Sequence, residues 1–371
     1  MGKNLQTFDK LKKLLSKNSF FRFIYKKYRN FKVFIEIYLN FSSKENKKIN
    51  LSTAKVYFAG AEIANIGGPY LKIKKLQKFF PENKRKFNLI YALSNSPNLT
   101  IQSIKLLKKR RIPIILNQNG VFYPSWYKGN WNNQNLLISK VYHSADYVFW
   151  QSNFCKKAAD KFLGERVGKG EVLYNAIDTN KFFPIKKSSD NIFRFLITGN
   201  ISKNNNYRIY SVIQSFKDIV KSNKNIHLYI AGIIEDLDYF NYEVEKFNLR
   251  RFITFLGPYS QKDAPKIYQK VDAYITMSFQ DNCPSAVIEA MSCGLPILYS
   301  SSGGIPELVG KDAGIGLKVS EDWEKVIVPT KKEIHEGILK IIDNEKSMSC
   351  NSRVRAEKLF GIDSWIRRHE E

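Results

Sequence analysis

Short apolar runs alternate with stretches of helical period along most of the chain, and this alternation limits the fold more than any other feature. A first series of strands is expected at 55–59, 89–93, 113–116, 147–150 and 171–173, with helices between them at 70–80, 99–110, 133–145 and 153–163. A repeated strand–helix order predicts a parallel sheet that is covered by helices on both faces.

A second series follows the polar stretch 175–191. Its strands are expected at 193–198, 226–231, 252–256, 273–276, 297–299 and 316–319, and its helices at 206–222, 239–248, 263–270, 284–292 and 331–343. The sequence therefore predicts an α/β protein with two Rossmann-like domains, at 52–180 and 181–345, and a C-terminal helix within 346–371. Neither half contains a G-x-G-x-x-G run, which argues against a dinucleotide-dependent dehydrogenase.

The charge balance indicates an anionic partner. The chain carries 60 Lys and Arg against 34 Asp and Glu, a formal net charge of +26, so nucleic acid, an acidic membrane surface and phosphorylated substrates all come into question. No nucleic-acid recognition motif is present, and nucleic acid is not expected. The four cysteines form no CxxC pair and the four histidines have no metal-ligand spacing, so neither a disulfide framework nor a protein-built metal site is expected.

Residues 1–51 form a basic extension. The first fifty residues hold 13 Lys and Arg against three acids, and apolar residues recur at three- and four-residue steps between Leu5 and Ile35. This pattern predicts an amphipathic helix. Two readings remain open: the helix lies on an anionic bilayer, or it packs on the protein with its basic face in water. No transmembrane span or secretory signal is recognisable, so we expect a cytoplasmic protein, either free or on the inner face of the membrane.

The segment from Asp281 to Pro296 carries the strongest chemical signal. It follows an expected strand, and Pro284 suits the first position of the next helix. The amides of Ser285, Ala286 and Val287 would then form a helix start that can bind a diphosphate. Asp281 and Glu289, before and inside this helix, can accept hydrogen bonds from sugar and ribose hydroxyls. The alternative is an ordinary strand–loop–helix with incidental acids.

This segment resembles the signature of family 4 of the retaining glycosyltransferases with the GT-B fold: an acid, seven residues, Glu-Ala-Met, two residues and Gly-x-Pro. The resemblance implies that Glu289 binds the nucleotide ribose, that Asp281 binds donor-sugar hydroxyls, and that Asn282 through Ala286 hold phosphate and sugar. The family usually has Glu where this chain has Asp281. The carboxylate therefore reaches about 1.5 Å less far, which leaves the donor sugar open.

The resemblance extends over roughly residues 53–370. Matching segments are 151–154, 174–178, 256–259, 303–309 and the tail from Arg353 onward. It implies two domains that face each other across a cleft, with the donor on the second and the acceptor on the first. It also implies a Tyr259 contact near the nucleotide base, and transfer with retention, without a metal ion or other cofactor.

Two loops of the first domain are further candidates. Gly67 and Gly68 stand where the family has a Gly-Gly loop that faces the donor phosphates, although a plain tight turn explains them equally well. Gln118 and Asn119 follow an expected strand, and their amides can bind acceptor or donor sugar hydroxyls. The alternative there is an Asn-Gly turn.

The cation that would bind the departing diphosphate is where this chain matches the family pattern least well. The first strand of the second domain ends at Gly199, and Asn200 follows where relatives usually have Arg. We choose Arg208 as the diphosphate clamp, because a guanidinium binds phosphate in a bidentate manner, and Lys203 as the second candidate. Alternatively, Arg208 is a surface residue and helix starts hold the diphosphate.

Together these features predict a glycosyltransferase that moves a sugar from a nucleotide-sugar to a saccharide or lipid-linked saccharide. Assembly of surface polysaccharide or lipopolysaccharide is the expected setting. Two alternatives stay open. A GT-B-like epimerase would convert a sugar nucleotide with no acceptor present. An inactive membrane-associated binding protein would bind membranes and hydrolyse no donor.

Overall fold

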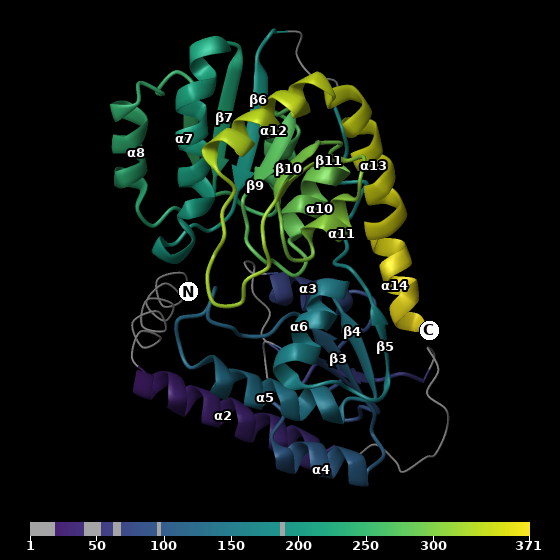
Figure 1. The fold of residues 1–371 in the computed structure, drawn as a ribbon. Helices are drawn as coiled ribbons and strands as arrows, with labels where there is room; N and C mark the ends of the chain where they lie inside the picture. The colour runs from purple at the N-terminus through teal and green to yellow at the C-terminus, as the bar shows by residue number, and fades with distance from the viewer. Residues whose placement is uncertain (1–18, 41–52, 62–67, 95–97, 186–189) are drawn as a thin grey trace, which may run out of the picture. The chain divides into compact units, whose positions relative to one another are not determined.

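The computed structural model describes residues 19–40, 53–61, 68–94, 98–185 and 190–371. The chain groups into two compact units, which Figure 1 shows as ribbons. Unit 1 comprises Met1–Gln118, Leu136–Phe149 and Arg166–Gly170, and unit 2 comprises Asn119–Asn135, Trp150–Glu165 and Glu171–Glu371. Two segments that the sequence pattern assigns to the first domain, 119–135 and 150–165, thus make most of their contacts with unit 2.

The first series of strands forms a five-stranded sheet in the order β1-β2-β3-β4-β5. The strands are β1 Val56–Tyr57, β2 Leu89–Leu93, β3 Ile114–Gln118, β4 Tyr147–Trp150 and β5 Lys169–Val172. The pairs β1–β2 and β2–β3 are parallel. The helices between the strands are α3 Gly68–Leu76, α4 Ile101–Lys109, α5 Trp131–Ser144 and α6 Asn153–Leu163.

Side-chain caps explain where two of these helices begin. The hydroxyl of Thr100 accepts the Ser103 N–H at 3.1 Å before α4, and that of Ser152 accepts the Cys155 N–H at 2.9 Å before α6. Each cap satisfies a backbone donor that the first helical turn leaves without an internal partner.

Helix α2, Ser19–Tyr38, packs on unit 1 beside α4 (Figure 1). Val33 and Ile37 are buried in the contact. The Arg29 guanidinium donates to the Gly60 carbonyl at 2.8 Å, and that of Arg110 to the Ile37 carbonyl at 2.6 Å. One face of the described part of the predicted extension therefore packs on unit 1. Residues 1–18 and 41–51 of the extension lie outside the described residues.

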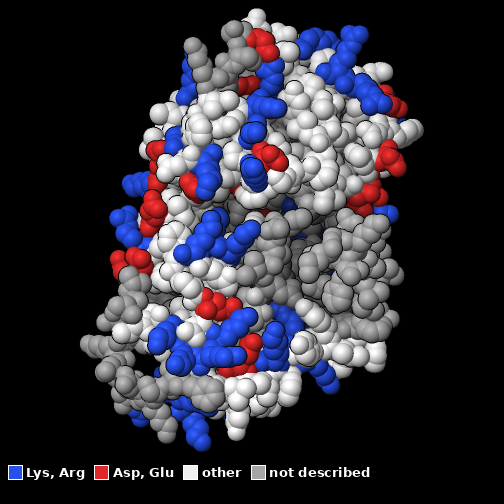
Figure 2. All heavy atoms as spheres, turned by 180° about the vertical axis from the view of Figure 1, so that it is seen from behind, with Lys and Arg blue, Asp and Glu red and all other residues white. Residues whose placement is uncertain are grey.

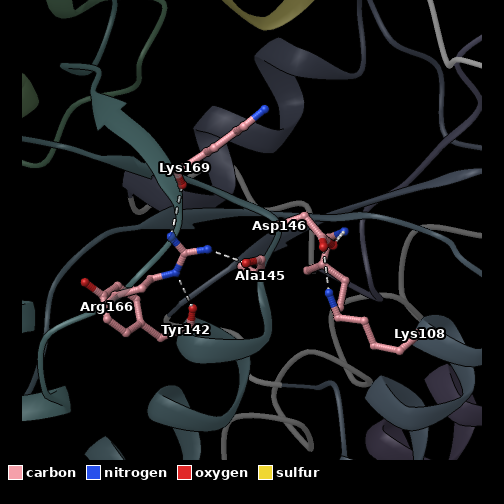
Figure 3. Close-up of polar contacts among 7 residues, drawn as sticks. Lys108, Tyr142, Ala145, Asp146, Arg166 and Lys169 are labelled. Atoms are coloured by element: carbon pink, nitrogen blue, oxygen red, sulfur yellow. Dashed lines mark hydrogen bonds and ion pairs between the residues drawn. The ribbon is translucent and has the colours of Figure 1, made fainter.

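A polar cluster closes the C-terminal end of α5 (Figure 3). Arg166 donates to the carbonyl of Tyr142 at 3.0 Å, to that of Ala145, and to that of Lys169 at 3.0 Å. The last carbonyls of a helix have no partner inside it, so this guanidinium stabilises the end of α5 and joins it to the start of β5.

Unit 2 contains a six-stranded sheet in the order β11-β10-β9-β6-β7-β8, with parallel neighbours throughout. Its strands are β6 Phe193–Thr198, β7 Ile226–Ala231, β8 Ile253–Gly257, β9 Ala273–Thr276, β10 Ile297–Ser301 and β11 Gly314–Lys318. The chain builds outward from β6 first in one direction and then in the other. The switch between β6 and β9 is where ligands of such sheets bind, at the carboxyl ends of the strands.

Helices cover both faces of this sheet (Figure 1). They are α7 Tyr207–Ser222, α8 Leu237–Lys246 and α12 Lys331–Asp343 on one side, and α9 Ala264–Tyr268, α10 Ser285–Ser292, α11 Ile305–Val309 and α13 Glu345–Phe360 on the other. Along β6, Phe195 and Ile197 enter the first core and Leu196 enters the second, because successive strand residues point to opposite faces. The predicted α/β fold with two parallel sheets is confirmed.

The tail differs from the single final helix that the sequence pattern predicts. Helix α13 ends at Phe360, and a second helix, α14, covers Ile362–Glu370. Between them the Ile177 N–H donates to the Phe360 carbonyl at 2.8 Å, and the Ile177 carbonyl accepts the Ile362 N–H at 3.0 Å. These bonds use backbone groups that a continuous helix would need, so the helix breaks at Gly361. None of the helices in the described ranges is long and apolar enough to cross a bilayer.

Replacing Arg166 with Met tests the cluster at the end of α5. The substitution leaves the Tyr142 and Ala145 carbonyls without their donor, so the free energy of unfolding should fall by about 1–3 kcal/mol. Urea denaturation measures the change. Lys169→Met is the matched control, since only its backbone carbonyl takes part; equal losses in both variants would contradict the assignment.

Candidate functional site

The loop between β9 and α10, residues 277–284, lies at the switch point of the unit 2 sheet. Burial raises the pKa of the Asp281 carboxyl, and the Arg208 guanidinium is the chief influence that lowers it. Arg208 stands in the first turn of α7. The structure thus places the cation chosen from the sequence close enough to Asp281 to act on its charge.

The backbone of this loop follows a constrained path. Gln280 has a φ of +51°, in the left-handed region that side chains other than Gly seldom adopt. Its N–H donates to the Ser302 hydroxyl at 3.0 Å, and its carbonyl accepts the Tyr123 hydroxyl at 3.1 Å. These bonds hold Gln280 in the turn, and the turn directs the following Asp281 side chain.

Glycines permit other parts of the backbone to approach the loop closely. A Cβ on Gly303 would lie 2.4 Å from the Asp281 carbonyl oxygen, and one on Gly304 2.0 Å from that of Asn282. A Cβ on Gly120 would lie 2.5 Å from the Asn282 amide nitrogen. The Gly304 N–H donates to the Asp281 carbonyl at 2.8 Å. Side chains at Gly303 and Gly304 would displace the loop backbone, whereas one at Gly120 would require the Asn282 side chain to move.

Three buried polar atoms around Asp281 have no hydrogen-bond partner among the described residues. They are Arg208 Nε, Gln280 Nε2 and Asn282 Oδ1. Each unsatisfied buried group costs about 1–3 kcal/mol, so native structures contain few of them. Their gathering at one loop is what a binding site for a polar ligand shows when the ligand is absent.

Glu289 lies in the second turn of α10 and is only 8% exposed. Its carboxylate accepts the Tyr268 hydroxyl at 2.9 Å and the Gln261 amide at 3.2 Å. Burial raises the pKa of Tyr259, a hydrogen bond with Thr198 lowers it, and the charge of Glu289 adds to the rise. A carboxylate held by neutral donors can exchange them for ligand hydroxyls without a large change in charge.

The start of α10 differs by one residue from the prediction. Pro284 has an extended ψ of 116° and precedes the helix instead of opening it. Its carbonyl accepts the Val287 N–H at 3.1 Å, so the expectation that this amide is free for an anion is wrong. The amides of Ser285 and Ala286, in the first turn, are the ones that remain for an anion.

Gly199 follows β6, and its surroundings are open: no heavy atom of the described residues lies within 4 Å of where its Cβ would be. Lys203, the second candidate for the diphosphate, instead forms an exposed ion pair with Asp236 at 3.5 Å. Its backbone N–H also donates to Glu235 at 3.0 Å. The charge of Arg208 therefore acts on Asp281, whereas the Lys203 side chain pairs with Asp236.

The candidate site residues from the first strand–helix series belong partly to unit 1 and partly to unit 2. Gln118 is fully buried at the end of β3 in unit 1, whereas Asn119 belongs to unit 2, where its amide oxygen accepts the Gln151 side chain. Gly68 is the first residue of α3, and Gly67 lies outside the described residues.

Glu307 has a role that sequence reasoning missed. Its carboxylate accepts the Asn153 N–H at 2.8 Å, the Asn153 side-chain amide at 2.7 Å and the Phe154 N–H at 2.8 Å. It therefore caps α6, and a charge at this end of a helix is favourable. The partners are more than 150 residues apart in the chain, and no local pattern indicates such a contact.

The comparisons with known proteins agree with this geometry. The sequence model of the family described as "Glycosyl transferases group 1" matches residues 178–357, the range that holds Asp281 and Glu289. The chain belongs to the group 1 glycosyltransferases. An uncharacterized glycosyltransferase of Methanocaldococcus jannaschii is 24% identical to this glycosyltransferase over 341 residues, 80% of each chain.

Two further relatives carry more informative names. The UDP-Gal:alpha-D-GlcNAc-diphosphoundecaprenol alpha-1,3-galactosyltransferase of Escherichia coli is 24% identical over 201 residues, 50% of this glycosyltransferase and 49% of the relative. The crystal structure of HepE from Anabaena in complex with UDP and glucose superposes with a TM-score of 0.61 at 16% identity, covering 81% of this chain and 80% of HepE. The structural likeness indicates the same GT-B fold.

Gly304→Ala tests whether backbone packing sets the Asp281 loop. Because the added Cβ must displace the Asn282 carbonyl, turnover of a nucleotide-sugar should fall about 100-fold, the loss that a shift of ~1 Å produces in an active site. Steady-state kinetics measure the change. Gly361→Ala, at an ordinary backbone conformation between α13 and α14, should retain activity; full activity of Gly304→Ala would contradict this account.

Proposed function

We propose that this glycosyltransferase moves a sugar, with retention of configuration, from a nucleotide-sugar to a saccharide or lipid-linked saccharide. The observation that carries the proposal is the Asp281 loop at the switch point of the unit 2 sheet, where the unpartnered buried polar atoms of Gln280 and Asn282 accompany that of Arg208, whose charge acts on Asp281. The group 1 signature in the same segment gives these residues their roles by resemblance.

The donor site is assigned as follows. Arg208 binds the diphosphate through its guanidinium, and the amides of Ser285 and Ala286 add a helix start with positive partial charge. Glu289 accepts hydrogen bonds from the ribose hydroxyls, and Asp281 from hydroxyls of the transferred sugar. Remaining donor-side contacts are proposed for Gly67, Gly68, Gly199, Lys203, Tyr259, Asn282 and Pro284, and sugar contacts for Gln118 and Asn119.

The protein's contribution to the reaction is positioning and charge stabilisation. As the bond between the sugar and the diphosphate breaks, negative charge grows on the leaving phosphate, where Arg208 stabilises it. The same phosphate oxygen takes the proton from the acceptor hydroxyl, so no side chain needs to act as a base. Acceptor attack on the face that the diphosphate leaves gives retention.

The relatives suggest where to begin the search for substrates. HepE binds UDP and glucose in its crystal structure, and the Escherichia coli relative is named for UDP-Gal and a diphosphoundecaprenol-linked sugar. We therefore propose a UDP-sugar as donor and a lipid-linked saccharide as acceptor. Lipopolysaccharide or another surface polysaccharide would be the product.

Helix α2 supports a location on the inner face of the membrane. One seam of the helix is packed on unit 1, and the opposite face exposes apolar side chains at helical spacing, namely Phe20, Phe23, Ile24, Tyr28 and Phe31. The ammonium of Lys27 lies 4.5 Å from the Phe23 ring. Aromatic and basic side chains on one face of a helix fit the interface of an anionic bilayer. Lys and Arg also outnumber Asp and Glu on the face drawn in Figure 2.

A panel of UDP-, GDP-, ADP- and dTDP-sugars tests the catalytic proposal. One donor should bind and slowly release its nucleotide. Glu289→Ala should weaken nucleotide binding at least tenfold, because a charged hydrogen-bond acceptor contributes about 1.5–3 kcal/mol, while Asp281→Ala should mainly reduce discrimination between sugars. Glu336→Ala, an exposed glutamate on α12, is the control.

The outcomes of this panel distinguish the transferase from the epimerase and from the inactive binding protein. Conversion of a sugar nucleotide in the absence of acceptor would favour an epimerase. Absence of binding by every donor at millimolar concentration would reject the transferase and leave the inactive binding protein.

Vesicle flotation tests the membrane proposal. Wild-type protein should float with vesicles that contain anionic lipid and much less with zwitterionic ones. Changing Phe20, Phe23 and Phe31 together to Ser should reduce binding more than tenfold, because each buried Phe contributes about 1.5–3 kcal/mol. The matched control changes three exposed apolar residues of α8, Leu237, Tyr239 and Tyr242, to Ser. Equal binding by both triple variants would reject α2 as the contact.

A further inference from the structure

The segment 121–131 of unit 2 is unusually aromatic, and the donor assignment does not use it. It contains Phe122, Tyr123, Trp126, Tyr127 and Trp131. Tyr123 is buried, whereas Trp126 is 47% exposed. Exposed indole rings are enriched where proteins bind other molecules, because one part of the ring is apolar and its N–H is polar.

The exposed ring is held in a fixed orientation. Trp126 stacks on Phe122 with ring centres 5.0 Å apart and an interplanar angle of 27°, and its Nε1–H donates to the Val121 carbonyl at 3.1 Å. The backbone of Phe122 is in turn held at both its N–H and its carbonyl by the buried Asn135 side chain, at 2.9 and 2.7 Å. A side chain fixed in this way loses little conformational freedom when a ligand binds.

The same segment contacts the donor loop directly. The Tyr123 hydroxyl donates to the Gln280 carbonyl at 3.1 Å, and the Ser125 hydroxyl to the Gln280 side-chain oxygen at 3.4 Å. The Ser125 N–H also donates to the Trp323 carbonyl at 2.9 Å. Ser125 thus contacts Gln280, the residue before Asp281, and Trp126 directly follows Ser125 in the chain.

The chemistry of the ring matches a sugar. The face of an indole carries partial negative charge and attracts the partially positive C–H groups on one face of a pyranose. Polar side chains flank it in the sequence, namely those of Ser125, Lys128 and Asn130, which suits a ligand with hydroxyls at its rim and an apolar face. None of the groups assigned to the donor lies in segment 121–131, so this ring is available for the second substrate.

We propose that Trp126 is a stacking platform for a pyranose ring of the acceptor saccharide. The proposal rests on the proposed transferase function, since it assigns part of the acceptor site to the same unit as the donor loop. The ligand class is a neutral pyranoside, and recognition occurs through ring stacking and not through charge.

Fluorine NMR of protein labelled with 5-fluorotryptophan tests this on the intact fold. The Trp126 signal is identified as the one missing from Trp126→Phe. Methyl glycosides of glucose, galactose, mannose and N-acetylglucosamine are the probes, added at tens of millimolar. At least one should shift the Trp126 signal in a saturable manner and leave the Trp365 signal unchanged. A Trp126 signal that no glycoside moves would overturn the proposal.

Substitution provides a second measurement. Saturation-transfer NMR should show the C–H protons of the bound glycoside in wild type and in Trp126→Phe. In Trp126→Ala the apparent affinity should fall about 5- to 100-fold, the range of a single aromatic stacking contact. Tyr242→Ala, an exposed aromatic of α8, should match wild type; unchanged glycoside affinity in Trp126→Ala would also overturn the proposal. Because the probes contain no nucleotide, this result is independent of the donor panel, whose failure would reject the transferase itself.

Discussion

The close approach of two backbone segments in unit 2 determines the geometry of the candidate site. The loop that carries Asp281 lies against Gly303 and Gly304 at distances that no Cβ would permit, and the Gly304 N–H bonds to the Asp281 carbonyl at 2.8 Å. The same loop needs Gln280 in a left-handed conformation. A strained residue of this kind persists only where its surroundings hold it, and here Ser302 and Tyr123 do so.

The two hydrophobic cores of unit 2 supply the rigidity that this arrangement needs. Residues of β6 alternate between the cores, so the sheet is fixed from both faces and its carboxyl edge is a firm base for the loop. The ends of the surrounding helices are fixed by side chains from distant segments. Arg353 of α13 donates to the Ser292 carbonyl at the end of α10 at 2.6 Å, and Glu307 caps α6. The start of α10, which is proposed to hold the diphosphate, is thus supported from its far end.

Much of the fold and part of the site could be predicted from the sequence, because strands in parallel sheets are continuous apolar runs. Strands β6, β7 and β9 have the predicted bounds. The charge of Arg208 acts on Asp281, and the assignment of Arg208 to the diphosphate stays a prediction. What could not be predicted depends on contacts between distant segments. The ion pair of Lys203 with Asp236, the cap from Glu307 and the helix break at Gly361 have no signature in local periodicity. Nor does periodicity say which face of α2 is buried. Ile24, Tyr28 and Phe31 of the predicted apolar stripe are exposed, whereas Val33 and Ile37 are buried.

In this site the backbone sets the shape of the loop and side chains are proposed to contact the substrates, and this separation affects how substrate preference can change during evolution. Hydrogen bonds of main-chain atoms and the lack of side chains at Gly303 and Gly304 set the shape of the loop. Asp281, where the family usually has Glu, also accepts the Cys283 N–H at 3.3 Å, but the contacts that set the path of the loop are made by its backbone. Substrate preference in this enzyme can therefore drift one side chain at a time while the path of the loop, and with it the basic chemistry, is inherited unchanged.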